Sequence, residues 1–262
     1  NYVERTVIKA IKNDIAIYAI HTNLDNYVGG VNAKIGALLG LENLRILAPK
    51  KGVLNKITVF VPSEDSEKVA QAMFANGAGN IGNYDECSFE STGKGAFKPL
   101  DGANPTIGQV DHREFVSETK LEVLCSTHNT AKVLHAMKSA HPYEEVAHDV
   151  IPLANANHFE GAGMIGELSE PIKTTSFLKQ LKEKFKTGCV RHTPIVHESI
   201  KTVAFCGGSG SFLIGAAKGA GADLYITGDV KYHEFFDAEN NLIIADIGHF
   251  ESEQYTPQLI HE

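Results

Sequence analysis

Apolar positions along the first fifty residues predict a helix, a strand and a second helix. They recur at helical spacing over residues 3–12, and residues 15–20 form a short apolar run of the kind seen in buried strands. That run leads directly into His21. Residues 33–41 are mostly apolar again and include Gly40, a residue type favoured at helix C-termini. We therefore expect a buried strand to deliver His21 from the interior of a folded core.

The pattern changes after residue 50 and predicts a separate inserted domain. Strands are expected at residues 56–61, 115–126 and 146–152, and helices at residues 67–75 and 130–140. Residues 77–108 are rich in Gly, Asn and Pro and too long for a simple connection, which indicates a functional or interface loop. Two successive β-α-β patterns form the ferredoxin-like split arrangement. We expect such a domain over residues 51–154.

The remaining residues resume the first domain with alternating strands and helices. Helices are expected at residues 176–185, 212–219 and 233–238, and strands at residues 202–206, 223–227 and 242–245. This β-α-β-α-β order favours a mostly parallel sheet with right-handed crossovers. The predicted fold is therefore an α/β core of residues 1–50 and 155–262 with a mostly parallel sheet, interrupted by the ferredoxin-like α+β insert.

The composition of the chain argues against several classes of protein. The 262 residues are 43% hydrophobic and 21% charged, and the net charge of −8 argues against a basic surface that grips nucleic acid directly. No apolar run approaches the roughly 20 residues that span a bilayer, and the first residues lack the features of a secretory signal. The four cysteines form no C-x-x-C pair, so we expect reduced thiols in a cytoplasmic protein.

Several potential metal ligands follow predicted strands. His21 and Asp25 follow the first strand, and His249 and Glu253 follow the last, where a helical turn would point both the same way. Asp229, His233 and Asp246 lie nearby in the pattern. Carboxylates and imidazoles suit Zn, Fe or Mn, and ligands collect at the carboxyl ends of parallel strands. The alternative is that these histidines, among 12 in the chain, only satisfy nearby backbone groups.

Three further motifs allow two interpretations each. The run 207–210, Gly-Gly-Ser-Gly, could bind an anion through backbone N–H groups or form a tight turn. The stretch 141–145, His-Pro-Tyr-Glu-Glu, could contact a ligand or a neighbouring subunit, or only end a helix and start a strand. Within 227–233, Asp229, Lys231 or His233 could act as acid/base or orienting groups.

An ordered set of motifs carries a family resemblance. Together they resemble the Nif-three-like family, often labelled GTP cyclohydrolase type 2 homologues: His-Thr-Asn-Leu-Asp (21–25), Gly-Ala-Gly-Asn-Ile-Gly-Asn-Tyr (77–84), His-Pro-Tyr-Glu-Glu (141–145), Gly-Gly-Ser-Gly (207–210), Thr-Gly-Asp-Val-Lys-Tyr-His (227–233) and Gly-His-Phe-Glu-Ser-Glu (248–253). The resemblance implies a toroidal homohexamer with a dinuclear metal centre facing its interior. It also implies that the insert is PII-like.

The same resemblance assigns site residues. It implies that Asp25, His249 and Glu253 are metal ligands with His21 close to them, and that the complete protein holds two divalent ions per subunit. The family pattern also has an upstream His-His pair and a final helix and strand. This chain begins after the place of the pair and ends soon after Glu253, so we expect two of five ligands to lie outside it.

The sequence and the resemblance together predict a metal-dependent hydrolase of cyclohydrolase or phosphoesterase type acting on an unknown small molecule. A bound water would attack an amidine-like or phosphoester bond, with His21 or His233 transferring protons. The main alternative is a hexameric regulatory or metal-handling scaffold without turnover, whose insert senses a small molecule or partner. A weaker alternative is a role linked to transcription, exerted through another protein because the chain is acidic.

Overall fold

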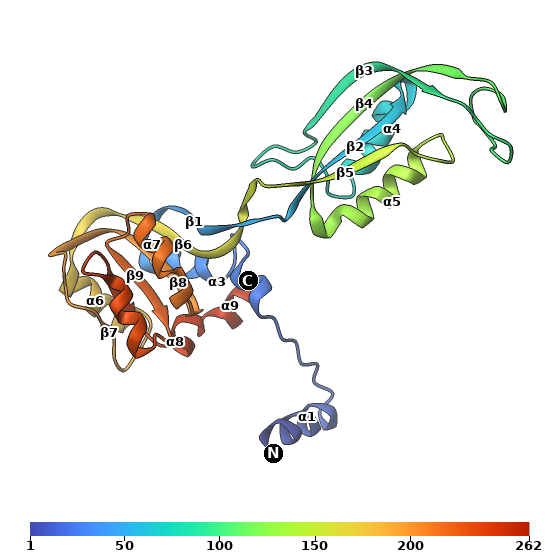
Figure 1. Ribbon diagram of the computed structural model, residues 1–262. Coiled ribbons are helices and arrows are strands. Elements are labelled where there is room, and N and C mark those ends of the chain that lie inside the picture. The colour runs from blue at the N-terminus through green and yellow to red at the C-terminus, as the bar shows by residue number, and fades with distance from the viewer. Residues whose placement is uncertain (262) are drawn as a thin grey trace. The chain divides into compact units, whose positions relative to one another are not determined.

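The computed structural model describes residues 1–261, which separate into two compact units. Unit 1 comprises Asn1–Ala48 and Phe159–Glu262, and unit 2 comprises Pro49–His158. Each unit has its own sheet, six-stranded in unit 1 and four-stranded in unit 2 (Figure 1). Over the described range, no helix is both long and apolar enough to cross a membrane.

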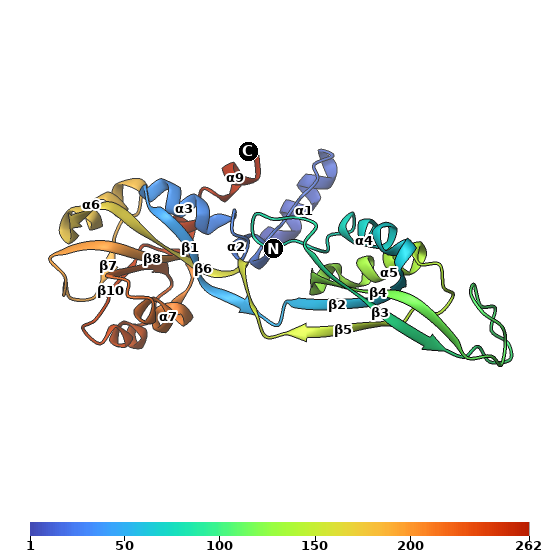
Figure 2. The same ribbon diagram turned by 90° about the horizontal axis from the view of Figure 1, so that it is seen from above.

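Unit 2 has the β-α-β-β-α-β chain order, with 3-10 turns preceding both helices. Its elements are β2 (Leu54–Pro62), α4 (Ser66–Phe74), β3 (Ser88–Phe97), β4 (Glu114–Ser126), α5 (Thr130–Ala140) and β5 (His148–Leu153). The strand order is β3-β4-β2-β5, and every neighbouring pair is antiparallel. Helices α4 and α5 lie side by side on one face of this sheet (Figure 2).

Strand alternation explains why unit 2 buries one face. Alternate residues of β2 and β4 point to the helices, and these are the apolar ones, including Ile57, Val59, Leu121 and Val123. They pack against apolar side chains of α4 and α5, such as Met73. The residues between them face away from the helices. The hydrophobic pattern therefore determines which face of the sheet is buried and where the two helices pack.

Strand β3 corrects one expectation. The predicted loop over residues 77–108 contains ten strand residues, Ser88–Phe97, which pair with β4 along their whole length. This strand lies at the edge of the sheet and is mostly exposed, so its residues show no alternation of polar and apolar character. Its conformation is determined by backbone pairing with β4, which is not visible in its own composition.

Unit 1 carries helices on both faces of a mixed sheet with the strand order β1-β6-β8-β9-β10-β7. Its strands are β1 (Glu42–Lys51), β6 (Ala156–Lys173), β7 (Arg191–His192), β8 (Ser199–Ser209), β9 (Leu224–Gly228) and β10 (Ile243–Asp246). Its helices are α1 (Tyr2–Lys12), α2 (Thr22–Asp25), α3 (Val31–Leu39), α6 (Thr174–Lys184), α7 (Ile214–Gly219), α8 (His249–Glu253) and α9 (Thr256–His261), together with the 3-10 helices η3 (Ser211–Leu213) and η4 (Tyr232–Ala238).

The expectation of a mostly parallel sheet is wrong for the sheet as a whole. Strands β8, β9 and β10 pair in parallel, whereas β6 pairs with β8 and β7 pairs with β10 in the antiparallel sense. The β-α-β-α-β run that suggested parallel strands does form the centre of the sheet. The flanking strands come from segments without that pattern, such as Ala156–Lys173, which forms β6.

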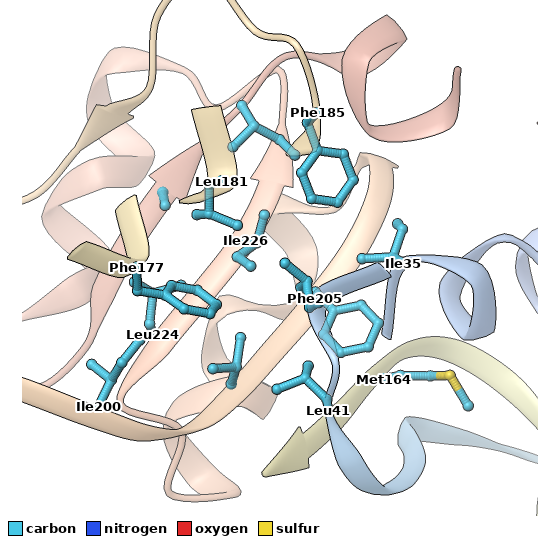
Figure 3. Packing of buried hydrophobic residues seen from close by; sticks show 14 of the residues in the cluster. Ile35, Leu41, Met164, Phe177, Leu181, Phe185, Ile200, Phe205, Leu224 and Ile226 are labelled. Carbon is cyan, nitrogen blue, oxygen red and sulfur yellow. The ribbon is translucent and has the colours of Figure 1, made fainter. Parts of the chain in front are cut away.

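The core of unit 1 explains why the three parallel strands read as continuous apolar runs. Side chains of β8 and β9 alternate between two clusters, because a doubly covered strand buries both faces. On one face Phe205 and Ile226 meet Phe177 and Leu181 of α6 and Ile35 of α3 (Figure 3). On the other face, side chains of α7 cover the sheet. The rigid centre of the sheet thus fixes the ends of β8, β9 and β10.

The predicted strand over residues 15–20 is not formed. These residues have no strand pairing among residues 1–261, and most are exposed. A strand requires a neighbour that supplies its backbone hydrogen bonds. An apolar run alone does not specify one. His21 is therefore delivered by the start of α2, as the residue that precedes its first turn.

Candidate metal centre

Three segments meet at the carboxyl ends of the parallel strands. Gly207 and Gly208 lie near the end of β8, Asp229 follows β9, and α8 begins at His249 just after β10. Helix α8 packs against β8 and β9. This edge of a sheet is where the backbone leaves the strands and where ligands commonly bind. The central strands thus bring together residues that lie more than forty positions apart in the sequence.

His249 is held between two carboxylates. Its Nδ1 lies 2.6 Å from Oδ2 of Asp229, and its Nε2 lies 3.5 Å from Oε2 of Glu253. Glu253 is four residues further along α8, so the helical turn brings both side chains to one face. The hydrogen bond with Asp229 raises the pKa of His249, and the charges of Glu253 and Asp25 act in the same direction. Asp229 fixes the imidazole and directs Nε2 toward Glu253.

Asp229 occupies an unusual backbone conformation. Its φ of 55° lies in the left-handed region, which non-glycine residues seldom adopt. Asp246 stabilises the turns on either side: its buried carboxylate accepts hydrogen bonds from the backbone N–H groups of Val230 at 3.0 Å and Gly248 at 2.9 Å. It also pairs with Arg191. The single carboxylate of Asp246 therefore links the loop that carries Asp229 to the loop that carries His249.

Asp25 and His21 approach the same group from α2. Burial raises the pKa of Asp25, while the nearby charges of His21 and His249 act to lower it. Burial also raises the pKa of Glu253, and there His249 and His21 lower it while Asp25 raises it. These four side chains therefore lie within electrostatic reach of one another. The Nδ1 of His21 is 2.8 Å from the Oγ1 of Thr22, which orients its ring.

Two residues that the sequence did not single out position this group. The buried Asn32 of α3 donates from Nδ2 to the backbone oxygen of Asp25 and accepts at Oδ1 from the N–H of Gly207. Ser252 accepts from the N–H of Gly208 and donates to the backbone oxygen of His249. Small polar residues inside helices carry no distinctive sequence signal, so only the three-dimensional contacts identify them.

The Gly-Gly-Ser-Gly run forms neither a tight turn nor an open anion cradle, because its first three residues are the end of β8, where the pairing with β9 is irregular. The N–H groups of Gly207, Gly208 and Gly210 already donate to the side chains of Asn32, Ser252 and Thr227. Gly208 has a φ of 66°, and a Cβ there would lie 2.4 Å from Oε1 of Glu253 and 3.2 Å from Nε2 of His249. The absence of a side chain at this position lets both donor atoms lie close to the backbone of Gly208.

His233 lies apart from these contacts. It belongs to η4, its side chain is exposed, and its ring packs edge-on against Tyr232 at 5.2 Å. No hydrogen bond or ion pair joins it to His21, Asp25, His249 or Glu253 in the described part of the chain. Its role as a proton carrier therefore stays a prediction.

The side chains of this group, an imidazole and carboxylates, are of the chemical types that bind divalent ions. Within residues 1–261, no three His, Cys, Asp or Glu side chains lie close enough to hold a metal ion by themselves. The Asp229–His249 pair nevertheless has the arrangement in which a carboxylate orients a metal-binding imidazole. The space beside Gly208 adjoins both Nε2 of His249 and a carboxylate oxygen of Glu253. Imidazole and carboxylate together suit Zn, Fe or Mn.

Comparisons of the sequence and of the structure with known proteins agree with one another. The chain is 44% identical over 247 residues to a "GTP cyclohydrolase 1 type 2 homolog" of Halalkalibacterium halodurans and 41% identical over 248 residues to that of Bacillus subtilis; each match covers 94% of this chain and 66% of the relative. The chain therefore spans slightly less than two thirds of these curated relatives. The crystal structure of a Bacillus cereus protein related to NIF3 matches with a TM-score of 0.81 and 40% identity, over 98% of this chain and 70% of that one. The sequence profile described as Duf34/NIF3 (NGG1p interacting factor 3) matches residues 1–262, and the chain belongs to this family.

Proposed function

We propose that this protein binds divalent metal through His249, Glu253 and Asp25, and that the complete protein is a metal-dependent hydrolase. The observation that carries the proposal is the placement of His249 between Asp229 and Glu253, with both donor atoms close to Gly208. A histidine with only a structural role would not need its second ring nitrogen to face a second carboxylate. The family resemblance supports two ions per complete subunit.

The electrostatics of the donors support cation binding. Burial raises the pKa of both Asp25 and Glu253, so holding both in their charged forms costs free energy. A cation between them would offset this cost. A divalent ion there would supply the Lewis acidity that lowers the pKa of a bound water from 15.7 to about 7.

His21 is the better supported proton carrier. It interacts electrostatically with both Asp25 and Glu253, and its Nδ1 is oriented by Thr22. No hydrogen bond holds its Nε2 within residues 1–261, so this nitrogen can accept or donate a proton within the group. We propose that His21 takes up the proton that hydrolysis of an amidine-like or phosphoester bond releases, with the substrate unidentified beyond being a small molecule.

Metal content of the purified protein tests the first half of this proposal. Elemental analysis of the wild type should find bound Zn, Fe or Mn, which is lost in His249→Ala and Glu253→Ala. Asp229→Asn should weaken binding about 10–100-fold, since residues that orient metal-binding histidines have effects of this size. His192→Ala changes an exposed histidine outside this group and should leave metal content unchanged.

The same measurement on a version extended at its N-terminus examines the expected second ion. About two metals per extended chain, lost in both alanine variants, would support the dinuclear centre. Equal metal content in the wild type and in His249→Ala would contradict the assignment. Metal-loaded extended protein that hydrolyses no nucleotide or phosphoester would refute the hydrolase proposal and leave metal binding standing.

We also propose a cytoplasmic homohexamer whose unit 2 is PII-like. The β-α-β-β-α-β order of unit 2 supports the comparison of folds. Exposed aromatic side chains support oligomerisation: Tyr232 and Phe236 are 72% and 63% exposed, and Phe212 of the adjoining η3 is 71% exposed. The hydrogen bond between Ser211 and Glu234 joins η3 to η4, so the three aromatics share one region of the surface. Exposed apolar patches of this kind often mark subunit interfaces.

A further inference from the structure

Unit 2 contains a cavity of about 360 Å³ that the metal centre does not use. It is lined by residues of β2, β3 and β4 and of the loop that follows β3. This loop, residues 98–113, extends beyond the ends of β3 and β4 (Figure 2). Its apolar lining includes Phe60, Phe97, Leu100 and Ile107. Phe60 and Glu118 alternate with buried residues of β2 and β4, so they share the sheet face opposite the helices. The volume lies at the small end of the range for small-molecule sites.

The His-Pro-Tyr-Glu-Glu stretch forms one wall of this cavity. The buried His141 lies with its Nε2 3.0 Å from the backbone oxygen of Phe60 and accepts at Nδ1 from the N–H of Tyr143. The ring of Tyr143 lies 5.9 Å from that of Phe97. His141 thus anchors the wall to strand β2 and turns the Tyr143 side chain toward the cavity. This arrangement gives the motif a role beyond ending α5.

Two hydrogen bonds close the loop over the cavity. The hydroxyl of Thr106 donates to the backbone oxygen of Pro142 at 2.8 Å, and the N–H of Asn104 donates to Oε1 of Glu144 at 2.9 Å. Both connect the loop after β3 to the wall that carries Tyr143. The cavity is therefore bounded by segments that are 36 and 40 residues apart in the sequence and are bonded to each other.

Two polar groups at the cavity lack partners. The Oη of Tyr143 is buried and has no hydrogen-bond partner within residues 1–261, a condition that costs free energy. Glu118, which lines the cavity, has no hydrogen bond or ion pair within the described residues. Burial raises the pKa of Tyr143, and the charge of Glu118 raises it further, so the two groups lie within electrostatic reach. An unsatisfied buried hydroxyl in a native cavity calls for a bound group.

The charges at the cavity favour a cation. Three glutamates line it, Glu118, Glu144 and Glu145, against the single cation Lys98. Lys98 is already paired with Asp111 at 3.0 Å. Because the remaining charge is negative, an anion would be repelled. The apolar lining equally disfavours a small hydrated ion, since it offers no ligand for most of the ion's surface.

We propose that this cavity binds a small organic cation: an apolar, preferably aromatic, body that carries a protonated amine. The amine would donate to the carboxylate of Glu118 and to Oη of Tyr143, which satisfies both unpartnered groups. The apolar body would pack against Phe60 and Phe97. The proposal concerns unit 2 alone and does not depend on metal binding.

Calorimetric titration of the full chain with 2-phenylethylamine tests the proposal. The neutral analogue 2-phenylethanol and the anion 3-phenylpropanoate serve as matched probes of similar shape. We expect saturable binding of the amine, at least about tenfold weaker binding of the alcohol, and no binding of the carboxylate. Binding of the alcohol as tightly as the amine would overturn the assignment of a cation site, and no saturable binding of the amine would overturn the site itself.

Conservative variants assign the contacts. Glu118→Gln should weaken amine binding at least about tenfold, because a charge-assisted hydrogen bond is lost, and Tyr143→Phe should weaken it several-fold. Glu90→Gln and Tyr84→Phe alter exposed residues outside the cavity and should change nothing. Unchanged binding in Glu118→Gln would refute the proposal. Ala103→Trp, which fills the cavity from the loop, should abolish binding and provides a test if either conservative variant fails to fold.

Discussion

Gly208→Ala distinguishes the contribution of Gly208 to stability from its role beside the candidate metal donors at the end of β8. Gly208 has a φ of 66°, and the new Cβ would stand 2.4 Å from Oε1 of Glu253 and 3.2 Å from Nε2 of His249. Both atoms lie at the ends of side chains, so the carboxylate can rotate away and relieve the contact. We therefore expect the main consequence to be displaced donor atoms rather than a disrupted core.

The magnitude follows from the backbone and has a matched control. An alanine in the left-handed region costs about 1–2 kcal/mol relative to glycine. Gly40, which ends α3 with a φ of 71°, has open space where its Cβ would be. Gly40→Ala should therefore lose the same 1–2 kcal/mol of stability without touching the candidate metal centre. Urea denaturation of metal-free protein should find the two variants within about 1 kcal/mol of each other.

Metal affinity should distinguish the two variants. Competition with a chelator should show affinity at least about tenfold lower in Gly208→Ala, because Glu253 no longer reaches its position, and unchanged affinity in Gly40→Ala. Wild-type affinity in Gly208→Ala would refute the reasoning that the space beside Gly208 is where a metal binds. An equal loss in both variants would attribute the effect to reduced stability alone.

Three further predictions address other parts of the molecule. Asp246→Ala removes the buried carboxylate that accepts hydrogen bonds from two backbone N–H groups. Urea denaturation should therefore show a free energy of unfolding lower by about 2–5 kcal/mol. A loss under about 1 kcal/mol would contradict the role of Asp246 in joining the loops of Asp229 and His249. Burial raises the pKa of the Cys206 thiol to about 12, so iodoacetamide followed by mass spectrometry should find the exposed Cys189 modified and Cys206 protected until the protein unfolds. Burial also raises the pKa of Glu118, so above that pKa its charged form lowers the stability of the folded protein. Glu118→Gln should therefore raise the melting temperature near pH 8 and leave it unchanged below about pH 4, where the carboxyl is protonated in both the folded and the unfolded state. An equal change in melting temperature at both pH values would contradict this cause.

The sequence correctly predicted helices and strands whose own apolar residues face a hydrophobic core. The helix expected at residues 130–140 is α5, with Val133 and Met137 buried at helical spacing. Strand β4, Glu114–Ser126, was expected from its alternation, which the structure shows as alternating burial. In both cases one face is covered by the other elements of unit 2. Hydrophobic periodicity is informative there because it records which face is covered.

Elements that depend on a neighbour's backbone were missed or wrongly predicted. Strand β3 has polar and small residues and is held by pairing with β4. Residues 15–20 have the composition of a buried strand and no strand pairing within residues 1–261. In the candidate metal centre, the spacing of His249 and Glu253 was readable from the sequence. The buried contacts of Asn32 were not, because they join positions up to 175 residues apart.

The order of strands in unit 1 has a consequence for how the chain accommodates unit 2. The polypeptide leaves unit 1 through β1 and returns through β6, and these two strands are neighbours in the sheet. The exit and the re-entry are therefore adjacent, and the whole of Pro49–His158 is topologically the connection between two paired strands. Such a connection can change in length or content without altering the order of the strands it joins. Unit 2 can thus vary independently of the sheet edge that carries His249, much as an accessory module does when it is inserted at a single point.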